Sequence, residues 1–393
     1  MQLYCPLQVA PAGGHCPIGN VRFDCNAAGS DGSCAPVNPN PRVLSTGRAL
    51  PPHFADQETL LAEFRALWGR RHFNLDRLEQ LHRSVRVGGR HLALPLADYS
   101  KLTTFAQRND AWISAAVDIG EAALKNALDR AQLGPEAIDN LMFVTVTGIA
   151  TPSIDARLIN RMGLRTDVKR TPIFGLGCVA GAAGLARASD ILRGFPNGIS
   201  ALLAVELCSL TLQREDLSVA NIIASGLFGD GAAAVIIGGG DRAQTRSQRG
   251  PEIVATRSVF YPDTERVMGW DVIDSGFKVV LSPQVPALVK ARIAGDVDAF
   301  LSANALSRSD IKHWVCHSGG PKVLEAFEAA LELPKTALAR SWSSLQSVGN
   351  LSSASVLFVF DELLQSGEVK AGELGLLLAM GPGFCSELVL LRW

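Results

Sequence analysis

The 393-residue sequence predicts a layered α/β fold with a mixed β-sheet in each of two halves. Short apolar runs of the kind that form buried strands alternate with longer segments of helical periodicity from residue 43 to the end. A connection rich in glycine and arginine, Gly238 to Gln248, divides this alternation into two segments of similar pattern. We therefore expect an N-terminal half at 43–240 and a C-terminal half at 241–393.

Residues 1–42 differ in composition from the rest of the chain. They are rich in Gly, Pro, Asn, Ala and Ser and show little periodicity, so we interpret them as a poorly ordered extension. The cysteines of this segment are spaced 11, 9 and 9 residues apart and form no C-x2-C pair, which disfavours a zinc site. These cysteines are Cys5, Cys16, Cys25 and Cys34.

In the N-terminal half, apolar spacing predicts helices and buried strands in alternation. The predicted helices are 57–68, 110–131 with Asp110 as its candidate cap, 153–162, and a helix of small residues at 180–188. The predicted strands begin at Val43 and continue with 138–147, the short run at 170–174, 199–206 and 232–237. The basic segment 84–91 is predicted as a loop that is either solvated or a clamp for the phosphates of coenzyme A.

The C-terminal half repeats the alternation and ends its strands on glycine-rich loops. The predicted strands are 253–259, 314–316, 374–380 and 387–392, and the predicted helices are 284–302, 323–331 and 352–364. The loop after the second strand begins at His317, and Asn350 precedes the last helix. Loops of this kind allow a substrate to approach the backbone closely.

Composition excludes several classes of protein. The formal net charge is -1, whereas a nucleic-acid-binding surface needs a clustered basic excess. The sequence contains no apolar run near the roughly 20 residues that span a bilayer, and its start lacks the pattern of a secretory signal. We therefore expect a cytoplasmic protein with no nucleic-acid or membrane partner.

Cys178 lies where a predicted strand passes through a glycine turn into the helix of small residues. A thiol at the start of a helix faces unpaired backbone N–H groups, which favour negative charge and lower the pKa of a cysteine. One interpretation is therefore a thiolate nucleophile. The other, equally open from this segment alone, is a buried free cysteine that packs as a small hydrophobe.

His317 and Asn350 give Cys178 its candidate partners. A cysteine nucleophile needs a base or an ion-pair partner, and histidine is the usual one, so we expect a thiolate–imidazolium pair. The amide of Asn350 can donate a hydrogen bond to a developing oxyanion, or it can simply cap the helix that follows. A papain-like protease has the same three residue types, but the mid-chain cysteine and the tightly packing helix after it argue against that class.

From about Val43 onward the sequence resembles the type III polyketide synthases, the chalcone synthase-like branch of the thiolase superfamily. This resemblance implies a thiolase-like layered αβαβα fold built from two similar halves. Five motifs, which occur in the order and spacing of that family, carry it. They are Gly177-Cys178-Val179-Ala180-Gly181, Leu227-Phe228-Gly229-Asp230-Gly231, His317-Ser318-Gly319-Gly320-Pro321, Gly349-Asn350-Leu351-Ser352-Ser353 and Gly381-Pro382-Gly383-Phe384.

The resemblance implies a role for each matched residue. Cys178 matches the acyl-carrying nucleophile, and His317 and Asn350 match the pair that activates malonyl-CoA for decarboxylation. Phe228 matches a gatekeeping phenylalanine between the coenzyme A tunnel and the chain-building cavity. The remaining matches are cavity-lining Thr147 and Ser352, the cavity-shaping loop Gly381-Pro382-Gly383, and Arg77 and Arg83 in the segment that holds coenzyme A phosphates.

Three positions depart from the plant chalcone synthase pattern. Val279 replaces a second gatekeeping phenylalanine, Trp270 replaces a cavity glycine, and Thr151 replaces a cavity methionine. The pattern is closer to bacterial members that make alkylpyrones or alkylresorcinols. We therefore expect a medium- or long-chain fatty acyl-CoA starter, extended by malonyl-CoA and then cyclised.

Two other functions remain open. One is a ketoacyl synthase of the initiating type, which would perform a single extension with an acyl carrier protein. The other is a non-catalytic homologue that binds coenzyme A or a partner protein. For the polyketide synthase, the resemblance implies a homodimeric acyltransferase that needs no metal or redox cofactor, because the thiol and the coenzyme A thioesters supply the chemistry.

Overall fold

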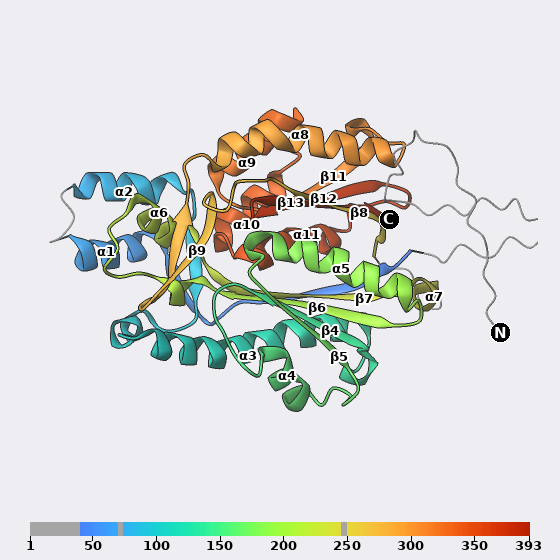
Figure 1. Cartoon of the computed structure of the whole chain (residues 1–393), viewed down its shortest axis with the longest axis horizontal. Helices are drawn as coiled ribbons and strands as arrows, with labels where there is room; N and C mark the ends of the chain where they lie inside the picture. Colours follow the sequence, from blue (N-terminus) through green and yellow to red (C-terminus); the bar gives the residue numbers. More distant parts are fainter. Residues whose placement is uncertain (1–39, 70–73, 245–249) are drawn as a thin grey trace, which may run out of the picture. The chain divides into compact units, whose positions relative to one another are not determined.

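The computed structural model describes residues 40–69, 74–244 and 250–393 (Figure 1). The predicted extension at 1–42 lies outside the described residues except for its last three, and so do Cys5, Cys16, Cys25 and Cys34. Arg42 already belongs to the first strand, which therefore starts one residue earlier than predicted. Within the described segments, no helix has both the length and the apolar character needed to cross a bilayer.

The centre of the fold is a nine-stranded mixed sheet with the strand order β11-β12-β13-β8-β1-β7-β6-β4-β5. In the N-terminal half, β4 pairs in parallel with β5 and β6, and β7 pairs antiparallel with β6 and β1. In the C-terminal half, β11 pairs in parallel with β12, and β13 pairs antiparallel with β12 and β8. The strands are β1 (Arg42–Ala49), β4 (Asn140–Thr145), β5 (Lys169–Phe174), β6 (Ile199–Leu207), β7 (Asp230–Gly238), β8 (Glu252–Phe260), β11 (Ile311–Cys316), β12 (Leu374–Gly381) and β13 (Cys385–Arg392).

The two sheets predicted from the sequence are joined, which corrects that prediction. Arg42 at the start of β1 pairs with Glu252 at the start of β8, so the hydrogen-bonded ladder continues from one half to the other. The Arg42 guanidinium also donates to the Glu252 carboxylate at 2.7 Å. The backbone junction is therefore reinforced by a charge-assisted hydrogen bond between side chains of the two halves.

Helices complete a five-layer arrangement, which confirms the predicted thiolase-like αβαβα fold. In Figure 1, α3 and α4 lie below the strands of the N-terminal half, α8 and α9 lie above those of the C-terminal half, and α5 and α11 lie between them. α5 contacts β4 and β6 on one side and β12 and β13 on the other. The helices are α3 (Phe105–Ala131), α4 (Ile154–Met162), α5 (Ala180–Gly194), α8 (Val285–Ala303), α9 (Pro321–Leu331), α10 (Ala339–Val348) and α11 (Ser355–Ser366).

A group of smaller elements gathers at one end of the molecule, on the left of Figure 1. α2 and α6 pack against each other, and α1 packs against both. The hairpin of β9 and β10 contacts this group through α6. These elements are α1 (Gln57–Trp68), α2 (Leu75–Ser84), α6 (Val219–Leu227), β2 (His53–Asp56), β3 (Gly89–Leu92), β9 (Met268–Ile273) and β10 (Gly276–Leu281). The short α7 (Gly240–Gln244) lies on the right of Figure 1.

The structure differs from the predicted elements at several places. The long helix α3 begins at Phe105, where Thr104 forms a capping box with Gln107, so Asp110 lies inside the helix and is not its cap. The segment predicted as a basic loop contains β3, and Arg90 on this strand is only 2% exposed. α2, α6, α10 and the β9–β10 hairpin were not predicted; these elements are short, with nine or ten residues in each helix and six in each strand.

Candidate active site

Cys178 lies in a single 3₁₀ turn, Gly177–Val179, between β5 and α5. Gly177 has a φ of +56°, and a Cβ atom at this position would lie 2.7 Å from Pro382 Cδ. Glycine is therefore required here both by backbone conformation and by space. The turn buries Cys178 to 6% exposure, and the Cys178 thiol donates to Ser352 Oγ at 3.7 Å.

Burial raises the pKa of the Cys178 thiol to about 12. The hydrogen bond with Ser352 opposes this rise, whereas the nearby Glu206 carboxyl adds to it. The net shift is therefore upward, opposite to the shift predicted from the helix N-terminus. A helix dipole contributes at most about 2 kcal/mol at a buried site, which is about 1.5 pKa units at 1.36 kcal/mol per unit, so the loss of water around the thiolate outweighs it.

His317 follows β11 directly and is 3% exposed. Its backbone N–H donates to Leu378 O at 2.9 Å, which continues the pairing of β11 with β12 for one more residue. Its Nδ1 atom has no hydrogen-bond partner among the described residues. Burial lowers the pKa of the imidazole to about 4, so the ring is neutral at pH 7 and can accept a proton.

Asn350 lies between α10 and the turn that precedes α11, and it is 2% exposed. Its Oδ1 accepts from Ser352 N at 2.8 Å and from Ser355 Oγ at 3.2 Å, which is the capping role proposed as the alternative. Its Nδ2 donates to Gly319 O at 3.2 Å, in the loop that begins at His317. An amide nitrogen has two N–H groups, so one side chain both caps the turn and retains a donor.

A continuous set of contacts connects these three residues. Cys178 bonds to Ser352, the Ser352 backbone bonds to Asn350, and Asn350 bonds to the loop of His317. The fold thus brings together residues that are 172 positions apart in the sequence, because Cys178 and Asn350 precede α5 and α11, the two helices of the central layer. The resulting group contains a thiol, a neutral imidazole and an amide donor, which together can form and break a thioester.

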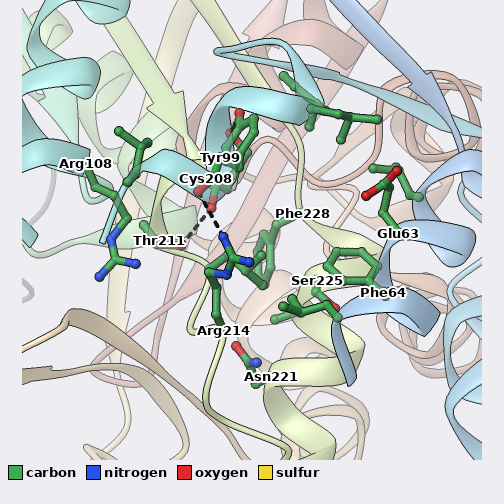
Figure 2. Close-up of a pocket in the computed structure, with 18 of the residues that line it drawn as sticks. Glu63, Phe64, Tyr99, Arg108, Cys208, Thr211, Arg214, Asn221, Ser225 and Phe228 are labelled. Atoms are coloured by element: carbon green, nitrogen blue, oxygen red, sulfur yellow. Dashed lines mark hydrogen bonds between the residues drawn. The ribbon is translucent and has the colours of Figure 1, made fainter. Parts of the chain in front are cut away.

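A cavity opens beside Cys178. Among the predicted site residues, Phe228, Trp270, Val279, Ser352 and Pro382 line it. A second and larger cavity, shown in Figure 2, shares Phe228, Trp270 and Val279 with it, and also Cys208. Two of the three positions that depart from the plant pattern, Trp270 and Val279, therefore line both cavities.

Other predicted residues lie elsewhere. Thr147 lines a different small cavity and donates to Glu206 Oε2 at 2.9 Å. Thr151 is exposed and is not among the residues that line the Cys178 cavity. Gly381 packs behind the site, where an added Cβ would lie 2.6 Å from Val179 N, and Gly383 lies beside Phe260.

Arg77 and Arg83 lie on α2, and neither lines the cavities around Cys178. Arg77 donates to Gln80 Oε1 at 2.6 Å. Arg83 forms a salt bridge with Glu58, with Nη2 2.9 Å from Oε2. Their assignment to coenzyme A phosphates stays a prediction.

Three residues near Cys178 were not predicted from the sequence. Val146, one position before Thr147, lines the Cys178 cavity. Cys208 lines both cavities. Glu206 is fully buried and accepts hydrogen bonds from Val146 N at 3.1 Å and Thr147 Oγ1 at 2.9 Å, while burial raises the pKa of its carboxyl. A glutamate near the end of an otherwise apolar strand was the signal that could have identified it.

Side chains that could ligate a metal do not cluster in the described part of the chain. Within 40–69, 74–244 and 250–393, no group of three or more His, Cys, Asp or Glu side chains is arranged to hold a metal ion.

The fold and this group of residues define a condensing enzyme of the thiolase-like type. Residues 34–241 match the N-terminal domain of chalcone and stilbene synthases, and residues 252–393 match their C-terminal domain. The chain therefore belongs to the chalcone and stilbene synthase family, the type III polyketide synthases, and the predicted acyltransferase class is confirmed.

Known relatives agree with this assignment. The chain is 50% identical over 351 residues to a 1,3,6,8-tetrahydroxynaphthalene synthase of Streptomyces peucetius subsp. caesius, covering 89% of this chain and 93% of that protein. It is 37% identical to a putative chalcone synthase of Bacillus subtilis, covering 89% and 98%. The solved structure of the tetrahydroxynaphthalene synthase of Streptomyces coelicolor A3(2), a bacterial type III polyketide synthase, superimposes with a TM-score of 0.85 at 32% identity, covering 90% and 99%.

Proposed function

We propose that this type III polyketide synthase builds its product on Cys178 by repeated decarboxylative condensation of malonyl-CoA. The connection from the Cys178 thiol through Ser352 to Asn350 and the His317 loop, at the wall of a cavity, is the main support. In the loading step the thiol attacks an acyl-CoA thioester. Its proton passes to the neutral imidazole of His317 and then to the departing coenzyme A thiolate, which leaves as the free thiol.

In the extension step malonyl-CoA loses carbon dioxide, and the electron pair of the broken C–C bond forms an enolate. N–H donors of His317 and Asn350 would stabilise the enolate oxygen, and one such donor is worth about 10²–10³ in rate. The enolate carbon then attacks the Cys178 thioester, and the Cys178 thiolate leaves and regains a proton. The lengthened chain can return to Cys178 for another cycle. Neutral donors suit this step, because a cation would stabilise the carboxylate that has to be lost.

The proposed reaction uses no metal or redox cofactor, because every step is an acyl transfer or a carbon–carbon bond formation between thioesters. We further propose that the enzyme acts as a homodimer, as the family resemblance implies. The mass of the protein in solution, measured by light scattering, would test this.

For the product, we propose a polyhydroxylated aromatic compound of the tetrahydroxynaphthalene type. The support is the relative of that name, which is 50% identical over 89% of this chain. Tetrahydroxynaphthalene has no alkyl side chain, so malonyl-CoA alone can supply all of its carbon atoms. This differs from the fatty acyl starter expected from the sequence.

The fatty acyl starter remains the second candidate, because a larger cavity adjoins the Cys178 cavity. Leu60, Leu96 and Leu212 are among its apolar lining residues, and such walls suit an alkyl chain. An alkylpyrone or alkylresorcinol would then be the product.

Mass spectrometry of products distinguishes the candidates. The enzyme is incubated with malonyl-CoA alone, and with malonyl-CoA plus lauroyl-CoA, in the absence of carrier protein. We expect an aromatic product from malonyl-CoA alone, which lauroyl-CoA does not replace. Products formed only with lauroyl-CoA, and containing its chain, would favour the second candidate. Failure of both reactions without a carrier protein would instead favour a ketoacyl synthase of the initiating type.

A further inference from the structure

Arginine side chains are concentrated along the wall of the larger cavity. Arg90, Arg108 and Arg214 all line it, whereas Glu63 is its one acidic lining residue in the described part of the chain. Figure 2 shows Arg108 and Arg214 on one side of this cavity, with Glu63 and Phe64 on the other. The cavity is therefore positively charged on one side.

Arg108 and Arg214 are held by backbone carbonyls and not by carboxylates. Arg108, which is 9% exposed, donates to Ser275 O, and Arg214 donates to Tyr99 O at 3.1 Å. Among the described residues, no carboxylate lies within ion-pair distance of either guanidinium. Burial lowers the pKa of Arg108, and the positive charge of Arg214 lowers it further, so the two guanidiniums are close enough to repel each other.

Arg90 adds a third group of the same charge. It is 2% exposed, and its Nη1 has no hydrogen-bond partner among the described residues. The Asp230 carboxylate stabilises its charge in part, which keeps its pKa at about 10 despite complete burial. A buried guanidinium without a facing anion, such as that of Arg108, is costly, so a cavity lined by it and by two further arginines is suited to an anionic ligand.

The larger cavity adjoins the cavity beside Cys178, where the acyl chain would be anchored. The two cavities share the lining residues Cys208, Phe228, Trp270 and Val279. A chain that is attached to Cys178 and passes these shared residues would enter the cavity that holds the arginines. Planar guanidiniums bind carboxylates in bidentate geometry, which suits a carboxylate at that far end.

We propose that Arg108 and Arg214 bind the distal carboxylate of a dicarboxylic acyl chain whose other end is the thioester on Cys178. This inference rests on the proposed function, in which malonyl-CoA supplies the starter as well as the extender. An ion pair with arginine stabilises the carboxylate and so opposes its loss as carbon dioxide. In the proposed extension step, the extender carboxylate is lost beside His317 and Asn350, which are both neutral. The positive charge of the arginines would thus keep the carboxylate on the starter, whereas the neutral His317 and Asn350 would let the extender lose its carboxylate.

The test measures loading of Cys178 without extension. Intact-protein mass spectrometry gives the rate of acyl-enzyme formation from three matched pairs: succinyl- and butyryl-CoA, glutaryl- and valeryl-CoA, and adipoyl- and hexanoyl-CoA. In Arg214→Gln, we expect loading of the dicarboxylic member of at least one pair to fall about 10- to 100-fold, since hydrogen bonds to charged groups contribute about 1.5–3 kcal/mol. Loading of the monocarboxylic members should stay within about twofold.

Two further variants serve as controls for a loss of folding in Arg214→Gln. Arg214→Lys retains the charge and should recover part of the selectivity for dicarboxylic chains. Arg161→Gln removes an exposed arginine of α4 that pairs with Asp118 and Glu121, and it should leave all loading rates unchanged. If Arg214→Gln lowers no dicarboxylic rate selectively, the proposal is wrong.

A last comparison separates the acyl carboxylate from the phosphates of coenzyme A as the anion. The same acyl groups are supplied as N-acetylcysteamine thioesters, which carry no phosphate. We expect the dicarboxylic preference and its loss in Arg214→Gln to persist. An equal loss for both members of each coenzyme A pair, absent with the N-acetylcysteamine thioesters, would assign the arginines to the phosphates and overturn the proposal. The proposed function would survive that outcome, because loading of Cys178 would still be observed.

Discussion

The two central helices, α5 and α11, occupy the same layer and each begins at a 3₁₀ turn of the site, but they are built from different residues. The first half of α5 is almost entirely alanine and glycine. The buried positions of α11 are mostly large, including Phe358 and Phe360. The α5 turn supplies Cys178, whereas the α11 turn supplies Ser352 and follows Asn350. The proposed acyl anchor Cys178 and the proposed donor Asn350 thus precede a helix of small residues and a helix of large ones, respectively.

The small residues of α5 allow the two turns to approach. A Cβ atom on Gly181 would lie 2.2 Å from the Ser353 carbonyl oxygen, one residue after the Ser352 that bonds to Cys178. The large residues of α11 fill the remaining space, and their dispersion contacts stabilise the layer. The comparison shows that close backbone approach, and not a large side chain, positions the thiol against its partners.

The largest expected effects separate the roles of the two turns. Cys178→Ala removes the acyl anchor and should lower product formation by at least about 10³-fold, as loss of a nucleophile does. Carbon dioxide release from malonyl-CoA should continue, because the enolate donors remain. Asn350→Asp keeps the acceptors for Ser352 and Ser355 but removes the N–H donor, so decarboxylation itself should fall by about 10²–10³.

Both reactions can be measured by product mass spectrometry and by release of labelled carbon dioxide. Thermal unfolding of each variant serves as the control for folding. Normal product yield in Cys178→Ala would contradict the nucleophile assignment, and a normal rate of carbon dioxide release in Asn350→Asp would contradict the donor assignment.

The next effect is on stability. Gly181→Ala places a methyl group against the backbone of the α11 turn and should lower the free energy of unfolding by about 1–3 kcal/mol or more. Gly194→Ala at the other end of α5 meets nothing within 4 Å and replaces glycine by a better helix former. It should change the free energy of unfolding by less than about 1 kcal/mol, in the stabilising direction. Urea unfolding of both variants checks the contrast; similar stabilities would mean that close packing at the α5 turn is not required.

The smallest effect concerns the ionisation of the thiol. Because the pKa of Cys178 is about 12 and that of His317 is about 4, both groups are neutral between these values. The thiolate fraction then rises about tenfold per pH unit, so alkylation of Cys178 by iodoacetamide should accelerate steadily from pH 6 to pH 10. Peptide mass spectrometry separates Cys178 from the other cysteines. A plateau that begins near pH 5 would instead reveal a thiolate–imidazolium pair in the resting enzyme.

The elements around the site were predictable in different degrees. α5 and β12 have strong apolar signals and distinct glycine boundaries, so their existence followed from local sequence. The β9–β10 hairpin, which carries Trp270 and Val279, has mostly half-exposed residues and was identified only as motif positions. Its two strands pair locally across the turn Asp274-Ser275, but no regular alternation of apolar and polar residues marks them as strands.

The sequence alone determined the fold class and the set of Cys178, His317 and Asn350, because buried strands, glycine turns and reactive residue types are local features. The tertiary structure decided which neighbouring residue faces the thiol. Val146 lines the Cys178 cavity, whereas Thr147 faces Glu206, and this difference of one position depends on the direction of the chain after β4. The tertiary structure also decided the protonation of Cys178. The pKa of Cys178 depends on how completely the packing around the central helices excludes water from its turn. The dipole of the helix that follows this turn favours the opposite shift of the pKa.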